Sequence, residues 1–320
     1  MEIRYVAPLQ RAWARMKRIL FNPFDLGKWL VIGFSAWLAR LAGGGGGGGM
    51  RVNPSRGHVA APEVGRLARE AWAYLRAHPN WLTLVIVGAV AVAVIVLLLV
   101  WISSRGKFVF LDNVAHDRAR IVEPWRRFAQ LGDSLFLWRL GYALVCLLAL
   151  AALGTAAVTA AGGFSGFGFG SVRSVTVTVL AALAAAFGAI ACAYVSLFLD
   201  SFIVPVMYRN GIGAVEAWRR LLPWVEAHLG AFLLYGLFVL GLVAAVGIGV
   251  VAAGLMTCCV ALLLVMLPYV GTVILLPFLV TYRAFSVEFL TQFDPGFAVF
   301  PEPAAPPTTE PTTPPAATPA

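Results

Sequence analysis

Long apolar segments alternate with short polar segments rich in arginine along most of the chain. The clearest apolar segment runs from Trp81 to Ile102, and it ends at Ser103, Ser104 and Arg105. A helix needs about 20 mostly apolar residues to cross the hydrocarbon core of a bilayer. This segment therefore predicts a transmembrane helix.

Further apolar segments satisfy the same criterion. Leu140–Ala161 contains no charge, and it is predicted as a span followed by a turn rich in glycine and phenylalanine. Residues 229–282 also contain no charge, and one helix of that length would extend for about 80 Å. This stretch is therefore predicted to turn back near Gly254–Thr257.

The first apolar segment is the weakest, because Lys28 and Arg40 lie near its two ends. Both long side chains can extend toward the interfaces, which lets the segment cross at some energetic cost. The predicted fold over residues 1–297 is all-α, a polytopic bundle of about six spans with interfacial amphipathic helices. The spans are predicted near residues 26–41, 81–102, 140–161, 178–200, 229–253 and 258–282. Five spans remain the alternative, if the first segment is re-entrant.

The distribution of lysine and arginine over the loops predicts the orientation of the bundle. With the N-terminus inside and six spans, 17 of the 24 Lys and Arg residues fall on inner segments. Cytoplasmic loops carry such an excess of positive charge, so both termini are placed in the cytoplasm. The first outer loop departs from this pattern, since it carries five arginines. The predicted location is the bacterial cytoplasmic (inner) membrane.

The composition agrees with a membrane protein. Of the 320 residues, 60% are hydrophobic and 12% are charged, whereas soluble domains carry about 25% charged residues. The net charge of +9 would suit nucleic acid if the basic residues shared one soluble face, but they lie between apolar segments. Nucleic acid is therefore not expected as a partner.

Two segments have a composition that cannot form a packed core. Gly43–Gly49 is an unbroken glycine run, and no Lys-Ser/Thr pair follows it as in a phosphate-binding loop, so it is interpreted as a flexible hinge. Residues 298–320 form a tail rich in Pro, Thr and Ala that is predicted to be disordered. Between the first two spans, Pro62–His78 is predicted as a helix outside the membrane.

An internal repeat is visible in the polar segments. Phe110–Asp112 followed by Glu123–Arg127 matches Phe198–Asp200 followed by Glu216–Arg220, and Arg11–Arg15 is a third, partial copy. Each copy leads into a predicted span. The pattern predicts three units, each an interfacial helix followed by a transmembrane hairpin. Chance similarity within a restricted membrane alphabet is the alternative.

The tryptophan and arginine residues of these copies suit a membrane interface. An indole lies well at headgroup depth, and a guanidinium can meet a lipid phosphate. Around Trp13, the apolar residues Leu9, Met16 and Leu20 recur on one helix face opposite several arginines, which predicts an in-plane amphipathic helix. The lipid-interface candidates are Trp13, Arg15, Trp125, Arg126, Arg127, Trp218, Arg219 and Arg220.

Several of these segments together resemble a known group of proteins. Asn22–Trp29, Ile203–Tyr208, Glu216–Trp218 and Arg283–Phe293 look like a bacterial family of uncharacterised multi-pass membrane proteins. That family is similar to the membrane domain attached to some glycerophosphoryl diester phosphodiesterases. The resemblance covers most of residues 9–297, and it implies a membrane domain without the catalytic barrel, which has no counterpart here.

No catalytic, cofactor or metal site is predicted. The four histidines lie in different loops without a partner at the spacing of metal ligands. No Gly-x-Ser-x-Gly nucleophile motif occurs. The four cysteines lie inside apolar runs and are interpreted as small buried hydrophobes. We therefore expect no enzyme activity and no cofactor.

Asp200 is the only charge within the apolar stretch 175–208. A buried carboxylate must find a partner or take up a proton. The structural interpretation is a tether to Arg139, His228 or backbone amides, for which Asp200→Asn should be tolerated and Asp200→Leu should not. The functional alternative is an ion or substrate contact. Its repeat counterpart Asp112 is expected in wetter surroundings.

The sequence thus predicts a non-enzymatic membrane protein that serves as a scaffold or organises lipid or protein partners. Its expected partners are anionic lipid headgroups at the cytoplasmic face and an unidentified protein. The alternative is a transporter or channel for a small molecule or lipid, since Pro268, Gly271 and Pro277 could break the last span as in transporter binding sites. A third possibility is an enzyme subunit acting beside a separate catalytic chain.

Overall fold

The computed structural model describes residues 4–42, 70, 73–74, 77–163 and 172–300. Every regular element in these ranges is a helix, which confirms the all-α fold class for them. The glycine run 43–49, most of the predicted helix 62–78 and the tail beyond residue 300 lie outside the described residues.

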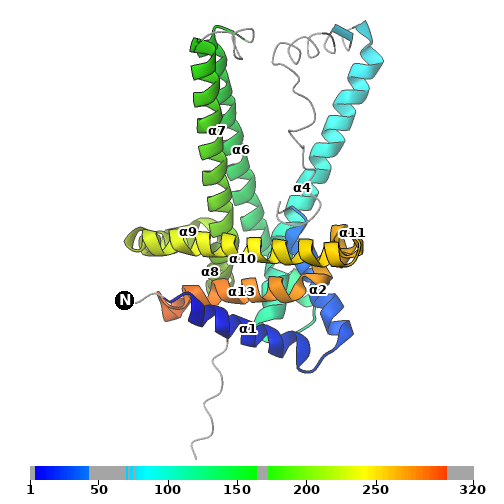
Figure 1. The fold of residues 1–320 in the computed structure, drawn as a ribbon, viewed down its shortest axis with the longest axis vertical. Helices are drawn as coiled ribbons and strands as arrows, with labels where there is room; N and C mark the ends of the chain where they lie inside the picture. Colours follow the sequence, from blue (N-terminus) through cyan, green and yellow to red (C-terminus); the bar gives the residue numbers. More distant parts are fainter. Residues whose placement is uncertain (1–3, 43–69, 71–72, 75–76, 164–171, 301–320) are drawn as a thin grey trace, which may run out of the picture.

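Three long helical segments extend from one end of the molecule. They are α4 (Pro79–His116), α6 (Ala129–Ala161) and the continuous segment formed by α7 (Val172–Phe198), η2 (Leu199–Ile203) and α8 (Val204–Asn210). Helices α6 and α7 run side by side as a hairpin, while α4 leans away from them along its upper half (Figure 1). The short helix α5 (Val122–Arg127) connects α4 to α6.

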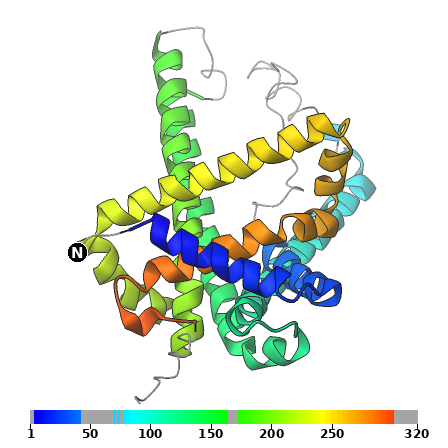
Figure 2. The same cartoon turned by 60° about the horizontal axis from the view of Figure 1, so that its bottom comes forward.

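The remaining helices lie across the lower parts of these long segments. Figures 1 and 2 show α1, α10 and α13 running roughly across the axis of the α6–α7 hairpin. These elements are α1 (Val6–Phe21), α2 (Leu26–Arg40), α9 (Ala214–Ala227), α10 (Leu229–Met256), α11 (Val260–Met266), α12 (Pro268–Ile274), α13 (Leu276–Leu290) and the 3₁₀ turn η3 (Pro295–Phe297). We call this layer the base.

Aromatic side chains hold the base to the α7 end of the hairpin. The Phe202 ring lies 4.7 Å from that of Tyr235 and 5.3 Å from that of Phe232, centroid to centroid. Phe289 of α13 packs on the same Tyr235 at 4.7 Å. All four side chains are buried. Because aromatic pairs at these distances add to the free energy of burial, this cluster joins η2, α10 and α13 into one core.

Four helical segments are long and apolar enough to cross a membrane. They are Asn80–His116, Ala129–Ala161, Val172–Asn210 and Leu229–Met256. Helices α12 and α13 together form a fifth candidate that is bent by 67°. The described residues therefore contain four or five candidate spans, and the count of six stays a prediction.

The first predicted span, residues 26–41, is not among these candidates. Helix α2 has 15 residues, or roughly 22 Å at 1.5 Å per residue, which is shorter than the hydrocarbon core of about 30 Å. It packs along the lower part of α4 instead. Lys28 forms an ion pair with Asp117 at 2.7 Å, and the Ser103 hydroxyl donates to the Ala39 carbonyl at 2.8 Å.

The last apolar stretch is interrupted, as the prolines suggested. Helix α10 ends at Met256, close to the predicted turn, and Cys258 and Cys259 adopt positive φ angles of 49° and 70°. Pro268 and Pro277 then lie in the first turns of α12 and α13. Because proline lacks an amide hydrogen, it is favoured at such starts and unfavourable within a continuous helix.

Candidate functional site

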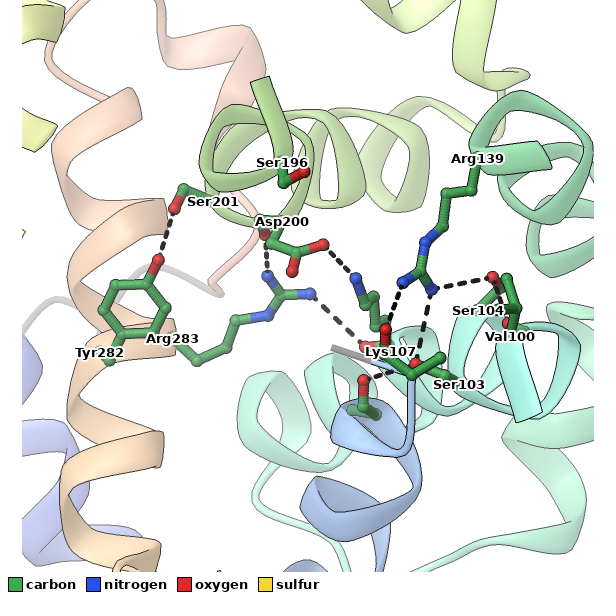
Figure 3. A network of polar contacts seen from close by, with 12 residues as sticks. Val100, Ser103, Ser104, Lys107, Arg139, Ser196, Asp200, Ser201, Tyr282 and Arg283 are labelled. Atoms are coloured by element: carbon green, nitrogen blue, oxygen red, sulfur yellow. Dashed lines mark hydrogen bonds and ion pairs between the residues drawn. The ribbon is translucent and has the colours of Figure 1, made fainter. Parts of the chain in front are cut away.

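Helix α4 continues beyond the apolar segment and carries polar side chains into the protein interior. The helix extends to His116, whereas the predicted span ended at Ile102. Ser103, Ser104, Lys107, Asp112 and Asn113 are buried along this extension. Since buried polar groups require partners, these residues mark a polar interior, and Figure 3 shows the part of it around Ser103, Ser104 and Lys107.

Lys107 and Asp200 form an ion pair between α4 and η2 (Figure 3). The Lys107 side chain is 7% exposed and the Asp200 side chain is 40% exposed, so the pair is open from the Asp200 side. Asp200 lies in a π-helical turn that ends two residues before Pro205, which cannot donate a main-chain hydrogen bond. Such turns occur frequently at functional sites.

Two arginines lie beside this pair. The Arg283 guanidinium donates to the main-chain carbonyls of Asp200 and Lys107, and its Nε is buried without a partner. The Arg139 guanidinium donates to the Ser104 hydroxyl at 3.3 Å and, more weakly, to the Ser103 hydroxyl at 3.5 Å. A further bond of 3.2 Å runs from Arg139 to the carbonyl of residue 42. Both guanidiniums therefore bond to neutral oxygens only.

The site contains more positive than negative charge. Lys107 pairs with Asp200 (Figure 3), and the charge of the Asp200 carboxylate also attracts Arg139 and Arg283. Arg40, at the end of α2, is also close enough for its charge to be attracted by Asp200. We refer to Lys107, Arg139, Asp200 and Arg283 as the cationic cluster.

The partners of Asp200 differ from those expected from the sequence. The predicted tether to Arg139 or His228 is wrong as a direct contact, because the carboxylate bonds to Lys107. The sequence places Lys107 on a cytoplasmic segment, because it follows the predicted end of the span at Ile102. Helix α4 does not end there, and its next turn brings Lys107 inward while Arg105 pairs with Asp133 at 2.8 Å.

Asp112 is also less hydrated than its position suggested. It is 5% exposed, and its Oδ1 accepts a hydrogen bond of 2.6 Å from the Tyr208 hydroxyl. His116 lies 3.3 Å from the same carboxylate oxygen. The expectation of wetter surroundings for Asp112 is therefore wrong, and Asp200 is the more exposed of the two repeat aspartates.

The first group of lipid-interface candidates lies on α1. Its buried side chains, including Ala12 and Met16, face α13, whereas Trp13 is 48% exposed. Arg15 approaches Glu288 of α13 at 3.6 Å. Burial lowers the pKa of the Arg15 guanidinium, and the charge of Glu288 opposes that change.

An open cavity of about 610 Å³ lies at the exposed edge of α1. Its lining combines aromatic rings with positive charges. The lining residues include Trp13, Lys17, Arg18 and Phe21. An apolar surface beside cations is the combination that a lipid interface requires.

The other two candidate tryptophans are partly buried by neighbouring helices. The Trp125 ring meets that of Trp101 edge-on at 6.1 Å, and Trp218 stacks on Trp138 at 5.6 Å. The indole nitrogen of Trp218 is buried and has no hydrogen-bond partner. Both rings therefore dock α5 and α9 onto the long helices.

The arginines that follow these tryptophans remain exposed. Arg126 and Arg127 on α5, and Arg219 and Arg220 on α9, present their side chains to the surroundings. Nearby Glu123 pairs with Arg120 at 2.6 Å, and this bond holds the pKa of the Glu123 carboxyl below its ordinary value. The two repeat copies thus share a docked indole and an exposed arginine pair.

Within the described ranges, no three His, Cys, Asp or Glu side chains gather as they would around a metal ion. A family model described as a family of unknown function (DUF7544) matches residues 4–299, and the chain belongs to that family. This match shows no link to glycerophosphoryl diester phosphodiesterases. No curated protein and no solved structure matches the chain.

Proposed function

We propose that this family member is a non-enzymatic, multi-pass protein of the bacterial cytoplasmic membrane that organises anionic lipid at its cytoplasmic face. The observation that carries the proposal is the pair of exposed double arginines at equivalent repeat positions. Arg126 and Arg127 on α5 and Arg219 and Arg220 on α9 each follow an indole that is docked on a long apolar helix. Each charge near an anionic membrane surface contributes about 1 kcal/mol of attraction.

The surface of α1 supports the same function. Val6, Trp13 and Phe21 are exposed large hydrophobic side chains on a helix that also carries exposed Lys17 and Arg18. Exposed aromatic and aliphatic side chains beside basic ones are typical of helices that lie at the lipid interface. The cytoplasmic placement of both termini rests on the six spans predicted from the sequence, for which 17 of the 24 Lys and Arg residues fall on inner segments.

A transporter or channel is the second candidate function. The bent α12–α13 pair and the interior cationic cluster favour it, because broken helices and buried charges occur at transport sites. A role as an enzyme subunit acting beside a separate catalytic chain stays a prediction.

The lipid proposal can be tested with the full-length protein reconstituted into vesicles. Brominated lipids quench tryptophan fluorescence, so the quenching by brominated phosphatidylglycerol and by brominated phosphatidylcholine reports which lipid surrounds the protein. We expect the wild type to prefer the anionic lipid, and we expect replacement of the four arginines by glutamine to remove that preference. Replacement of the same four residues by lysine is the matched control and should preserve it. Equal quenching of the wild type by both lipids would overturn the proposal.

A further inference from the structure

Two arginines of the cationic cluster lack a carboxylate partner of their own. Arg139 is half-buried and bonds to two hydroxyls and a carbonyl, and Arg283 is buried and bonds to two carbonyls. Asp200 is already held by Lys107. Removing an unneutralised charge from water is costly. An anion that joined the cluster would remove most of that cost.

We propose that the cationic cluster binds the phosphate group of an anionic phospholipid, and this inference rests on the lipid-organising function proposed above. Arg139 and Arg283 supply the planar guanidiniums that suit phosphate oxygens, and Lys107 adds a point charge. The buried Nε of Arg283 is a donor that has no partner within the protein. Asp200 holds Lys107 in place, and its 40% exposure marks the open side of the site.

The arrangement of the helices indicates a lipid as the source of the phosphate. Lys107 lies on α4, Arg139 on α6 and Asp200 at the lower end of the α7 segment, and all three helices extend from the cluster in the same direction (Figures 1 and 3). Many of their apolar side chains beyond the cluster are exposed. Examples are Val94, Leu98, Leu144, Leu148, Phe187 and Ile190. Acyl chains can cover these surfaces while the headgroup reaches the cluster.

The depth of the cluster agrees with this occupant. The apolar part of α4 ends at Ile102, and the uncharged part of α6 begins at Leu140. Lys107 and Arg139 therefore lie just beyond the apolar segments, where the phosphates of one leaflet are found. Basic pockets between transmembrane helices on the cytoplasmic side bind anionic headgroups in this way.

Native mass spectrometry of the full-length protein, purified in a mild non-ionic detergent, tests the inference. We expect the wild type to retain an anionic phospholipid through purification. Arg139→Gln and Arg283→Gln should each reduce the retained fraction by about tenfold, because each removes charge-assisted hydrogen bonds to the phosphate. Arg173→Gln is the matched control, since Arg173 is exposed near the start of α7, at the end of that helix far from the cluster, and it should retain the lipid at the wild-type level.

The outcomes separate the two proposals and the two phosphate sources. The inference is wrong if all variants retain the lipid or if the wild type carries none. The proposed function is tested separately, by the preference of the protein for anionic lipid in the vesicle experiment. In a second measurement, delipidated protein receives inorganic phosphate or short-chain phosphatidylglycerol, and only the lipid should raise the melting temperature. Equal stabilisation by inorganic phosphate would overturn the lipid assignment. If Arg283→Gln does not fold, as judged by size-exclusion chromatography, Arg139→Gln and its charge-preserving partner Arg139→Lys decide the result.

Discussion

The hydroxyl of Tyr208 donates a hydrogen bond of 2.6 Å to the carboxylate of Asp112, although 96 residues separate them. A second polar pair, Lys107 with Asp200, joins the same two segments across 93 residues. Asp112 follows Lys107 on α4, and its partner Tyr208 likewise follows Asp200. The end of α4 and the η2–α8 segment therefore run parallel. Each repeat aspartate is therefore held by a residue of the helical segment that carries the other repeat aspartate.

The Asp112–Tyr208 bond should contribute to stability. Tyr208→Phe removes the donor and leaves the buried carboxylate of Asp112 with one hydrogen bond fewer. This change should lower the free energy of unfolding by about 1–3 kcal/mol. Detergent-solubilised protein would show this as a lower melting temperature. Asp112→Asn combined with Tyr208→Phe forms a double-mutant cycle, and strictly additive effects of the two changes would contradict a direct interaction.

The Lys107 contact changes the expectation for Asp200. A neutral asparagine cannot balance the buried ammonium of Lys107, so Asp200→Asn should now destabilise the protein, and Asp200→Leu should do so by about 3–5 kcal/mol. The double variant Lys107→Met/Asp200→Leu removes both charges and should recover much of the stability that Asp200→Leu alone loses. Melting temperature and membrane abundance measure both effects. A double variant less stable than either single one would rule out the pairing as the cause.

Gly106 should be required for the packing of α2 on α4. A Cβ placed there would lie 2.7 Å from the main-chain carbon of Leu38 and 2.8 Å from the amide nitrogen of Ala39. Gly106→Ala should therefore move α2 away from α4 and lower the free energy of unfolding by about 1–3 kcal/mol. Gly154→Ala on α6 is the control, because no atom of a neighbouring helix lies within 4 Å of its added Cβ. In thermal unfolding experiments on both variants, only Gly106→Ala should have a lower melting temperature than the wild type.

Cys146 and Cys192 should form a crosslink between α6 and α7. Their sulfur atoms lie 3.2 Å apart, and both thiols are free. Mild oxidation by copper phenanthroline should join them, so that a chain cut in the connection between the two helices runs as one species on a non-reducing gel. Cys146→Ser should abolish the link. Separate fragments from the oxidised wild type would contradict the pairing of these helices.

The charge distribution predicts which ends of the long helices face the cytoplasm. Reporter fusions after Asp117 and Gly211 should give cytoplasmic signals, and a fusion after Gly162 should give an external one, because basic residues concentrate on the former side. Alkaline phosphatase and green fluorescent protein fusions report the two sides. Reversed signals at all three positions would overturn the proposed orientation.

Local pattern was sufficient to predict the long apolar helices and a few of their ends, such as the end of α6 at Ala161 and the start of α10 at Leu229. The apolar lengths of α4, α6, α7 and α10 follow from uncharged runs, because a helix in lipid must satisfy its main-chain groups within itself. The breaks at Pro268 and Pro277 follow from the missing amide hydrogen of proline. The pairing of motif copies was visible as similarity between residues 110–127 and 198–220.

The position of each charge relative to the others was decided by the tertiary structure. Lys107 and Arg105 are two residues apart, yet one is buried against Asp200 and the other pairs with Asp133. Residues two apart on a helix face different directions, and the sequence does not state where α4 ends or which helix lies beside it. By itself the sequence determined an all-helical chain with long apolar helices, because hydrophobic periodicity and length are local properties. Only the packing of α4, η2 and α13 brought Lys107, Asp200 and Arg283 together, because contacts between distant residues depend on how the helices are arranged in space.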